Sequence, residues 1–342
     1  MSNFKYLAVL VLAISILLVS CGSTETLPTE SEEPIHLKVH ISNYLSVTPI
    51  YIAHEEGYFA EQNLEIEFIT LENSEQVVPL LASGQVDVSA AALTTGIINA
   101  IVRDQNIRVV AERGSFDPDG CTYSAILIPN DALESGKISD PSDLAGQLVR
   151  STATGPTAFF FDAVLGPYGL SIDDTNLVNI PAPNVGVELS SGSIAAAAMV
   201  EPFVSSIVEN GEAQIWYRAE EVIPEAVYGV LIYGNSILQN NREAGNRFMV
   251  AYLKGVRQYN EGKTEQNLQF FHDFTQLDFD VIESSCLPSI NPDGRINFEL
   301  GLDRFQQWAL EKGHIDAALS REEFFDDSFV EYANQALGEN AP

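Results

Sequence analysis

Five threonines stand where the sequence predicts that a helix begins: Thr48, Thr94, Thr95, Thr152 and Thr154. The free backbone N–H groups of a helix start, together with a neighbouring hydroxyl, can hydrogen-bond a polar ligand. Taken singly, each threonine is more simply explained as a helix N-cap, whose side chain accepts a hydrogen bond from the first turn. Because the pattern recurs in several loops, we expect these loops to converge on a polar ligand.

Four further residues near the same loops offer stacking and polar contacts. Asn43 and Tyr44 precede the first expected helix, and Tyr44 could stack on a planar ligand or lie on the surface as an ordinary aromatic. Glu201 could accept a hydrogen bond from a ligand, or could simply interact favourably with the start of its own helix. Tyr228 could line the floor of a cleft or belong to the core. These residue types predict binding without bond-making chemistry.

The four loops that carry these candidates, 43–48, 92–96, 151–155 and 201–203, contain no lysine or arginine. Arg150 directly precedes one loop, but alternation along a strand would turn its side chain away from the face of Ser151. Nitrate or a sulfonate could still be held by N–H groups alone. The loops therefore favour a neutral, planar, hydroxyl-bearing ligand over an anion.

Several kinds of enzyme site have no matching motif in the sequence. There is no CxxC, no HExxH and no GxSxG pattern, and the five histidines lack convincing spacing for a metal ion. We therefore expect no metal, no cofactor and no enzymatic activity.

The composition is strongly acidic, with 48 Asp and Glu residues against 17 Lys and Arg residues and a formal net charge of −31. Such a surface repels nucleic acid and anionic lipid headgroups, so a nucleic-acid partner is not expected. Hydrophobic residues make up 46% of the chain, which is ample for a packed core. We expect a monomer.

The first residues show the parts of an export signal: Lys5, an apolar run at residues 7–19, and then Cys21. The run is shorter than the roughly 20 residues that span a bilayer. The end of the run resembles the lipobox of bacterial lipoproteins, although an ordinary secretory signal with an incidental cysteine is the alternative. The resemblance implies a signal peptide at 1–20, a lipid (diacylglycerol, with palmitate) on Cys21, and anchoring on the outer face of the cell membrane.

Residues 21–34 are polar, acidic and proline-containing, and we expect them to form a flexible tether. Two cysteines remain beyond Cys21. Outside the cytoplasm, Cys121 and Cys286 could form a disulfide, or both could be buried free thiols, and the sequence leaves this choice open.

The remaining chain alternates expected strands with helices of about ten residues, which predicts βαβ units and mainly parallel sheets. One set of units ends near residue 128 and a second set follows, with a buried strand at 227–233 leading back to the first. In such sheets, ligands bind beyond the carboxyl ends of the strands, where the candidate loops lie. The expected strands are 35–41, 64–70, 86–91, 107–112, 123–128, 147–151, 176–180, 195–200, 214–218 and 227–233.

Four segments resemble one branch of the substrate-binding proteins of ABC importers, the branch that serves nitrate, sulfonates, taurine and thiamine-pyrimidine precursors. Residues 51–67 (YIAHEEGYFAEQNLEIE) resemble the opening motif of this branch, and residues 80–88 (LLASGQVDV) resemble its "L-x-x-G-x-V-D" segment. Residues 180–202 and 315–333 resemble later stretches. Asn63 replaces the usual glycine, and asparagine also tolerates the left-handed conformation expected there.

The resemblance implies a two-lobe periplasmic-binding-protein-like α/β fold (class II), in which two hinge crossovers join two mainly parallel sheets. We expect lobe 1 at residues 35–127 and 230–342 and lobe 2 at 128–229. The implied function is capture of a small molecule between the lobes and delivery to an ABC permease with a cytoplasmic ATPase. We expect a vitamin-like heterocycle such as riboflavin or a thiamine pyrimidine; the alternative ligand is a sulfonate, taurine or nitrate.

Two other classes of function remain. The same fold includes a pyrimidine synthase, an enzyme with an iron-linked, Cys-rich motif that this sequence lacks. A sensory or adhesive lipoprotein would have no neighbouring permease and ATPase genes.

Overall fold

The computed structural model describes residues 33–71, 76–103 and 106–338 of the chain. The expected signal peptide, the expected lipid site at Cys21 and nearly all of the expected tether lie outside these ranges. From Pro34 onward the chain forms one unit. Within the described ranges, no helix has both the length and the apolar character needed to cross a bilayer.

The first sheet contains, in the described chain, β1 (Ile35–His40), β2 (Leu64–Ile69), β3 (Val88–Ala92), β4 (Arg108–Ser115) and β10 (Val227–Tyr233), in the order β2-β1-β3-β10-β4. In β1, Leu37 and Val39 are buried while His36 and Lys38 are exposed, as alternation along a strand requires. β1 pairs in parallel with β2 and β3, whereas β10 runs antiparallel to β3 and β4. We call this sheet and its helices the first lobe.

The helices between these strands are α2 (Thr48–Glu55), α3 (Tyr58–Glu61), α4 (Val77–Ala82) and α5 (Thr95–Val102). The sequence predicts one helix over 49–59, but Gly57 with φ 76° ends α2 and separates it from α3. Asn63 has φ 54°, so this asparagine adopts the left-handed conformation expected of it.

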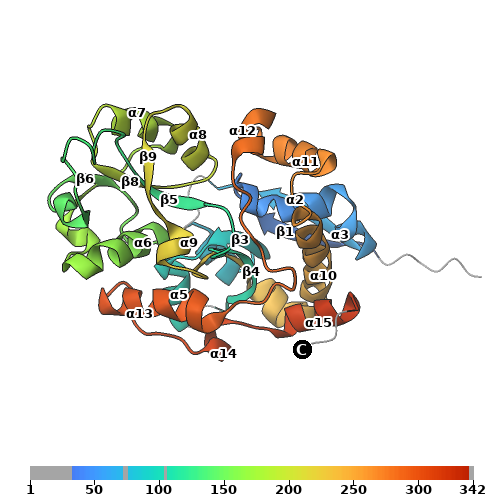
Figure 1. Cartoon of the computed structure of the whole chain (residues 1–342). Coiled ribbons are helices and arrows are strands. Elements are labelled where there is room, and N and C mark those ends of the chain that lie inside the picture. The colour runs from blue at the N-terminus through green and yellow to red at the C-terminus, as the bar shows by residue number, and fades with distance from the viewer. Residues whose placement is uncertain (1–32, 72–75, 104–105, 339–342) are drawn as a thin grey trace, which may run out of the picture. The chain divides into compact units, whose positions relative to one another are not determined.

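The second sheet contains, within the described ranges, β5 (Ser124–Ile128), β6 (Leu148–Arg150), β7 (Asn176–Val178), β8 (Ala196–Val200) and β9 (Gln214–Arg218), in the order β7-β6-β8-β5-β9. β6 pairs in parallel with β7 and β8, and β5 runs antiparallel to β8 and β9. Its helices are α6 (Pro156–Leu165), α7 (Val185–Ser190), α8 (Phe203–Glu209) and α9 (Ala219–Val222). We call this set the second lobe (Figure 1).

The two strands that follow the crossovers, β5 and β10, are buried along their whole length. Each lies between two antiparallel neighbours in its sheet, which explains the continuous apolar runs in their sequences. The chain therefore crosses between the lobes at residues 116–123 and 223–226. The boundaries expected at 127/128 and 229/230 fall inside β5 and β10. The expected two-lobe α/β fold with two crossovers is confirmed, with one opposing strand in each sheet.

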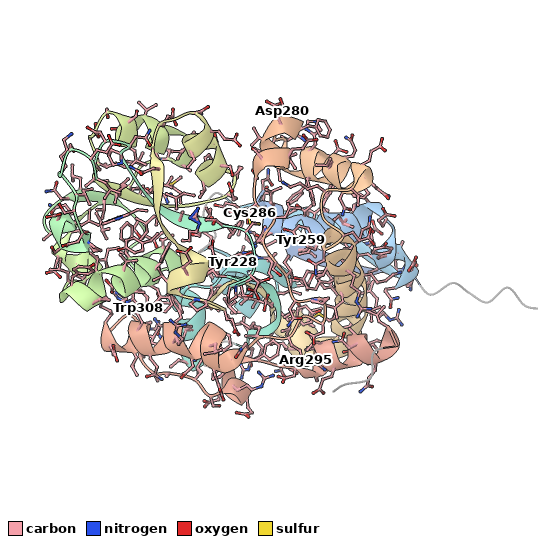
Figure 2. All side chains as sticks on the ribbon, in the orientation of Figure 1. Tyr228, Tyr259, Asp280, Cys286, Arg295 and Trp308 are labelled. Carbon is pink, nitrogen blue, oxygen red and sulfur yellow. A yellow bond between two sulfur atoms is a disulfide. The ribbon has the colours of Figure 1, made fainter. Side chains whose placement is uncertain are left out.

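The C-terminal part is mainly helical: α10 (Arg242–Tyr259), α11 (Glu265–Thr275), α12 (Phe279–Ser284), α13 (Arg304–Glu311), α14 (Arg321–Phe324) and α15 (Ser328–Ala336). α10 packs on α2 and α15 of the first lobe. α13 instead packs on α6 of the second lobe, where Trp308 Nε1 donates to Asp162 Oδ2 at 2.7 Å and Lys312 Nζ lies 3.0 Å from the same oxygen (Figures 1 and 2).

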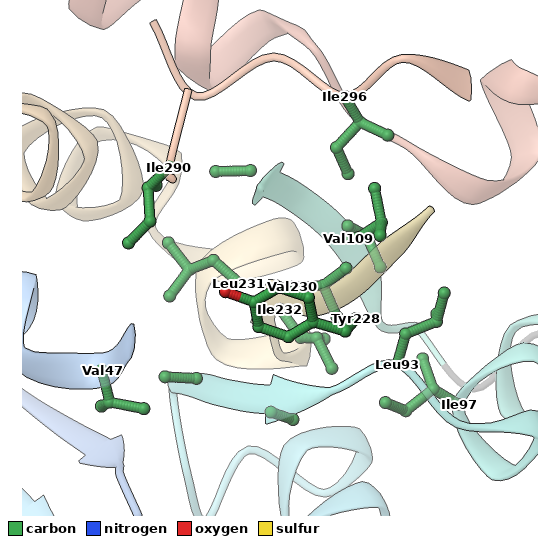
Figure 3. Packing of buried hydrophobic residues seen from close by; sticks show 14 of the residues in the cluster. Val47, Leu93, Ile97, Val109, Tyr228, Val230, Leu231, Ile232, Ile290 and Ile296 are labelled. Atoms are coloured by element: carbon green, nitrogen blue, oxygen red, sulfur yellow. The ribbon is translucent and has the colours of Figure 1, made fainter. Parts of the chain in front are cut away.

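A disulfide joins Cys121, in the first crossover, to Cys286, in the segment that follows α12. Figure 2 labels Cys286 between the two halves of the molecule. The apolar core continues across the crossovers, and Figure 3 shows Tyr228 within it, with Val47 and Ile290 also in the packed cluster.

Candidate functional site

The candidate site lies at one edge of the first sheet. β1, β3 and β4 run in the same direction, so their carboxyl ends meet there, and the antiparallel strand β10 begins at the same edge. In α/β sheets this edge is where ligands bind. Three buried side chains meet at it: Arg113 hydrogen-bonds Ser46, and its guanidinium carbon lies 6.0 Å from the centroid of the Tyr228 ring. Thr48 is buried two residues beyond Ser46.

Arg113 is the centre of this group and is only 4% exposed. Its Nη1 donates to Ser46 Oγ, and its Nη2 donates to the Ala91 carbonyl oxygen at 3.1 Å. Its Nε has no hydrogen-bond partner, and in the described part of the chain no carboxylate lies within ion-pair distance of the guanidinium. A buried charge without a counter-ion is costly. This guanidinium therefore has both unused charge and an unused donor.

Gly229 on β10 lets Arg113 reach its partners. The arginine extends from β4 to the β3 carbonyl of Ala91, and β10 lies between those two strands. A Cβ added at Gly229 would lie 2.6 Å from the Arg113 Cζ. Gly114, which pairs with Gly229, does the same for the Tyr228 ring, since a Cβ there would lie 2.0 Å from the tyrosine hydroxyl oxygen. The two glycines allow two large side chains to cross the sheet.

Two aromatic rings of the first crossover stack on Tyr228 of β10, beside the arginine. The Tyr228 ring lies 4.6 Å from Tyr123 and 5.1 Å from Phe116 between ring centroids. Burial raises the pKa of Tyr123 and raises that of Tyr228 well above its usual range, so both hydroxyls stay protonated and can donate. The Tyr228 hydroxyl has no partner in the structure. This stack joins the first crossover to the arginine cluster.

Two further polar groups complete the cluster. Thr48 is fully buried at the start of α2, and its hydroxyl has no partner. His40 Nδ1 lies 2.9 Å from Ser89 Oγ. Burial and then the Arg113 charge lower the pKa of His40, so it stays neutral and leaves Arg113 as the charged group of the cluster. A guanidinium N–H and hydroxyl groups without partners are the kinds of donor that bind an oxyanion.

The structure distributes the residues predicted from the sequence among several surroundings. Thr48 and Tyr228 lie in the arginine cluster. Thr94 caps α5 by accepting a hydrogen bond from Ile97 N at 3.4 Å. Thr152 Oγ1 shares a hydrogen bond of 2.8 Å with Thr157 Oγ1. Both threonines thus have the simpler capping or turn role open to them. Thr94 and Thr95 also line a cavity of about 460 Å³ between α4 and α5.

The other predicted residues lie nearer the surface or have partners of their own. Asn43 is exposed and Tyr44 is 44% exposed, while Thr154 is partly buried. Arg150 Nη1 donates to the Ala198 carbonyl at 2.8 Å. Glu201 is 2% exposed and accepts hydrogen bonds from Ser205 and Cys286 N.

Sequence reasoning missed Arg113, Ser46 and Gly229. The four loops contain no basic residue, whereas Arg113 lies within β4, two positions before its end. One signal was available: a glycine in the middle of a strand as apolar as 227–233 marks a close approach by another group. For metal binding, the described residues contain no group of three or more His, Cys, Asp or Glu side chains that could hold an ion.

Solved structures share this architecture, which is the two-lobe periplasmic-binding-protein-like α/β fold. The nitrate-binding protein NrtA from Synechocystis PCC 6803 aligns with a TM-score of 0.68 and 13% identity, covering 90% of each chain. The alkanesulfonate-binding protein SsuA from Xanthomonas axonopodis pv. citri, bound to MOPS, aligns with a TM-score of 0.63 and 15% identity over 82% of this chain and 94% of its own.

The model of the NMT1/THI5-like family matches residues 45–261, and the chain belongs to this family. The chain is also 24% identical over 300 residues to the "Putative binding protein YtlA" of Bacillus subtilis (strain 168), covering 82% of both sequences. The desulfurization enzyme DSZB shares the fold too, with a TM-score of 0.64 and 13% identity over 89% of this chain and 99% of its own.

Proposed function

We propose that this protein is the substrate-binding component of an ABC importer, and that it captures a small organic oxyanion, such as a sulfonate, between its lobes. The observation that carries the proposal is the buried guanidinium of Arg113, which has no carboxylate partner and an unpartnered Nε. An oxyanion would supply the missing charge and accept from Nε, from Thr48 Oγ1 and from the Tyr228 hydroxyl.

Two of the similar proteins support this ligand class by their own ligands. NrtA binds nitrate and SsuA was solved with MOPS, a sulfonate, and both are anions. A neutral heterocycle would leave the Arg113 charge uncompensated. One feature favours a heterocyclic ligand: the ring of Tyr44 is exposed and could stack on a planar group. An anion that carries an aromatic ring would use both features.

The remaining predicted residues have places in this proposal. Asn43, Tyr44, Thr94, Thr95, Thr152 and Thr154 belong to loops at the carboxyl edges of the two sheets, where closing lobes would bring them to the ligand. The chain would act outside the cytoplasm as a monomer, held by lipid at Cys21, and would hand its ligand to a permease. We propose no catalysis. In the described ranges Cys121 and Cys286 are the cysteines, and their disulfide leaves no free thiol.

Titration calorimetry of the purified protein tests the ligand class. Methanesulfonate, benzenesulfonate, taurine, nitrate, riboflavin and a thiamine pyrimidine would each be titrated. We expect a sulfonate to bind, and Arg113→Met to weaken it about 100-fold, because the variant loses charged hydrogen bonds of about 1.5–3 kcal/mol each.

Arg108→Met is the matched control, because Arg108 lies on the same strand at the opposite end. It should bind like the wild type. Tight binding of riboflavin by both the wild type and Arg113→Met, with no sulfonate bound, would reject the oxyanion and favour the heterocycle.

A further inference from the structure

Glu201, predicted from the sequence as a ligand-binding residue, has hydrogen-bond partners in both lobes. It follows β8 of the second sheet, and its carboxylate accepts from Ser205 Oγ at 2.6 Å and from Ser205 N at 3.0 Å, both in its own lobe. The same carboxylate accepts from the backbone N–H of Cys286 at 3.1 Å. Ser205 Oγ also lies 3.3 Å from the Ser284 carbonyl oxygen. Glu201 and Ser205 thus each form a hydrogen bond with the segment 283–287.

The segment 283–287 belongs to the first lobe by its other contacts. Lys263 Nζ donates to the Ser285 carbonyl at 2.7 Å. Just beyond the segment, the Tyr259 hydroxyl donates to Pro288 O at 3.1 Å and Asn260 Nδ2 donates to Ile290 O at 2.7 Å. Tyr259 ends α10, which packs on α2 of the first lobe. The Glu201–Cys286 hydrogen bond therefore runs from one lobe to the other.

The disulfide is a covalent link between this segment and the first crossover. It ties Cys286 to Cys121 in the first crossover, two residues before Tyr123 of the aromatic stack. A cavity of about 650 Å³ lies beside these contacts, bounded by Cys121, Cys286, Glu201, Ser205 and Lys263. Hydrogen bonds from Glu201 and Ser205 to the segment 283–287 therefore lie along the wall of a cavity between the lobes.

We propose that Glu201 and Ser205 form a latch that binds segment 283–287 only when the lobes are closed, and that the Cys121–Cys286 disulfide holds the Cys286 N–H in position to receive it. The inference rests on the proposed function, since a latch acts on a protein whose lobes open and close. In the open state Glu201 keeps its Ser205 partners and regains water, so opening leaves no orphaned charge. The latch thus adds stability to the closed state alone, and it raises ligand affinity by favouring that state.

Glu201→Gln tests the latch by removing its charge while keeping its shape and one acceptor oxygen. A hydrogen bond to a charged group is worth about 1 kcal/mol more than a neutral one, so we expect affinity for benzenesulfonate to fall about fivefold. Glu209→Gln is the control: Glu209 is exposed on α8, lines the same cavity and should leave affinity unchanged.

A double-mutant cycle separates the latch from a general loss of structure. Cys121→Ser with Cys286→Ser removes the disulfide and should weaken binding in the same direction. Adding Glu201→Gln to that background should cost clearly less than fivefold, because the N–H that Glu201 binds is no longer held in place. Equal costs with and without the disulfide would overturn the role proposed for the disulfide.

A ligand-free measurement distinguishes failure of the latch from failure of the proposed ligand. Spin labels on Val187→Cys in α7 and Glu265→Cys in α11 report the distance between the lobes by pulsed electron resonance. We expect Glu201→Gln to shift the ligand-free distances toward longer values, and Glu209→Gln to shift nothing. That shift without benzenesulfonate binding would support the latch and reject the ligand. Unchanged distances, or sulfonate affinity equal to the wild type, would overturn the latch.

Discussion

Arg113 and Glu201 are both buried charged groups at the edges of facing sheets, and their surroundings differ. Arg113 has two neutral hydrogen-bond acceptors, an unpartnered Nε and no carboxylate within reach in the described chain. Glu201 accepts two hydrogen bonds from Ser205 and one from Cys286. Burial raises the pKa of its carboxyl group, and these hydrogen bonds and the Lys263 charge partly oppose that shift. Arg113 therefore has a hydrogen-bond donor without a partner, whereas the carboxylate of Glu201 accepts hydrogen bonds from other residues of the protein.

This difference separates a binding role from a structural one. A buried charge costs folding free energy unless partners compensate it. Where the protein supplies the partners, as for Glu201, the group stabilises an arrangement of the chain. Where it does not, as for Arg113, the proposed oxyanion would supply the missing partner. The predictions below test the Arg113 side of the comparison.

Gly229→Ala should have the largest effect, because it displaces Arg113 without altering any charge. The new methyl group would lie 2.6 Å from the guanidinium carbon, so the arginine could no longer cross β10. We expect sulfonate affinity to fall about 100-fold, as expected for the direct Arg113 substitution. Calorimetry measures the loss. Gly166→Ala, where an added Cβ meets nothing within 4 Å, should bind normally; undiminished binding by Gly229→Ala would show that Arg113 does not hold the ligand.

Glu112, the residue before Arg113, is a buried acid, and its titration should make the stability of the protein depend on pH. Burial raises its pKa from 4.5 to about 7, although hydrogen bonds from Asn291 N and Ser115 partly oppose the shift. Between pH 4.5 and 7 the native state holds a proton that the unfolded chain has lost, so stability falls as pH rises through this window.

Glu112→Gln keeps the acceptor oxygen and removes the titration. The variant should match the wild type at pH 4.5 and exceed it at pH 8 by about 2–3 kcal/mol, measured by urea unfolding. The exposed Glu331, replaced by Gln, serves as the control. A wild-type stability that rises over this range, with no change in slope in Glu112→Gln, would contradict the expectation.

The smallest expected effect is on the stability of the ligand-free protein when Arg113 is replaced. Because the charge is uncompensated, Arg113→Met should raise the free energy of unfolding by about 1–2 kcal/mol in anion-poor buffer. Added sulfonate should stabilise the wild type and leave the variant unchanged. A variant that is instead clearly less stable would identify Arg113 as a structural anchor for Ser46 and Ala91.

The sequence predicted the fold in detail because strand alternation and helix boundaries are local. All ten expected strands are present with ends shifted by at most three residues, and the buried run 227–233 returns to the first sheet as predicted. The helix over 49–59 was wrong at one point, since the left-handed Gly57 interrupts it. The crossover positions were displaced because an apolar run such as 124–128 does not reveal which sheet it joins.

The candidate site was much less predictable, because it depends on contacts between distant segments. Thr48 and Tyr228 were named from their positions, but Arg113 reaches Ser46 across 67 residues of sequence and passes over a third segment at Gly229. No local pattern reports such a crossing. Likewise, the hydrogen bond from the Cys286 N–H to the Glu201 carboxylate joins residues 85 apart in sequence, and the sequence left open whether Cys286 pairs with Cys121.

The position of α13 has a consequence for how this architecture can evolve. Phe159 of α6 packs against Phe305 and Trp308, so the apolar surface of the second lobe is completed by a helix encoded after the first lobe has resumed. Exchange of the contiguous gene segment between the two crossovers would bring in a foreign α6 without its covering helix. New specificities in this lineage should therefore arise by substitution around Arg113, and recombination of whole lobes should require an accompanying change in the C-terminal third.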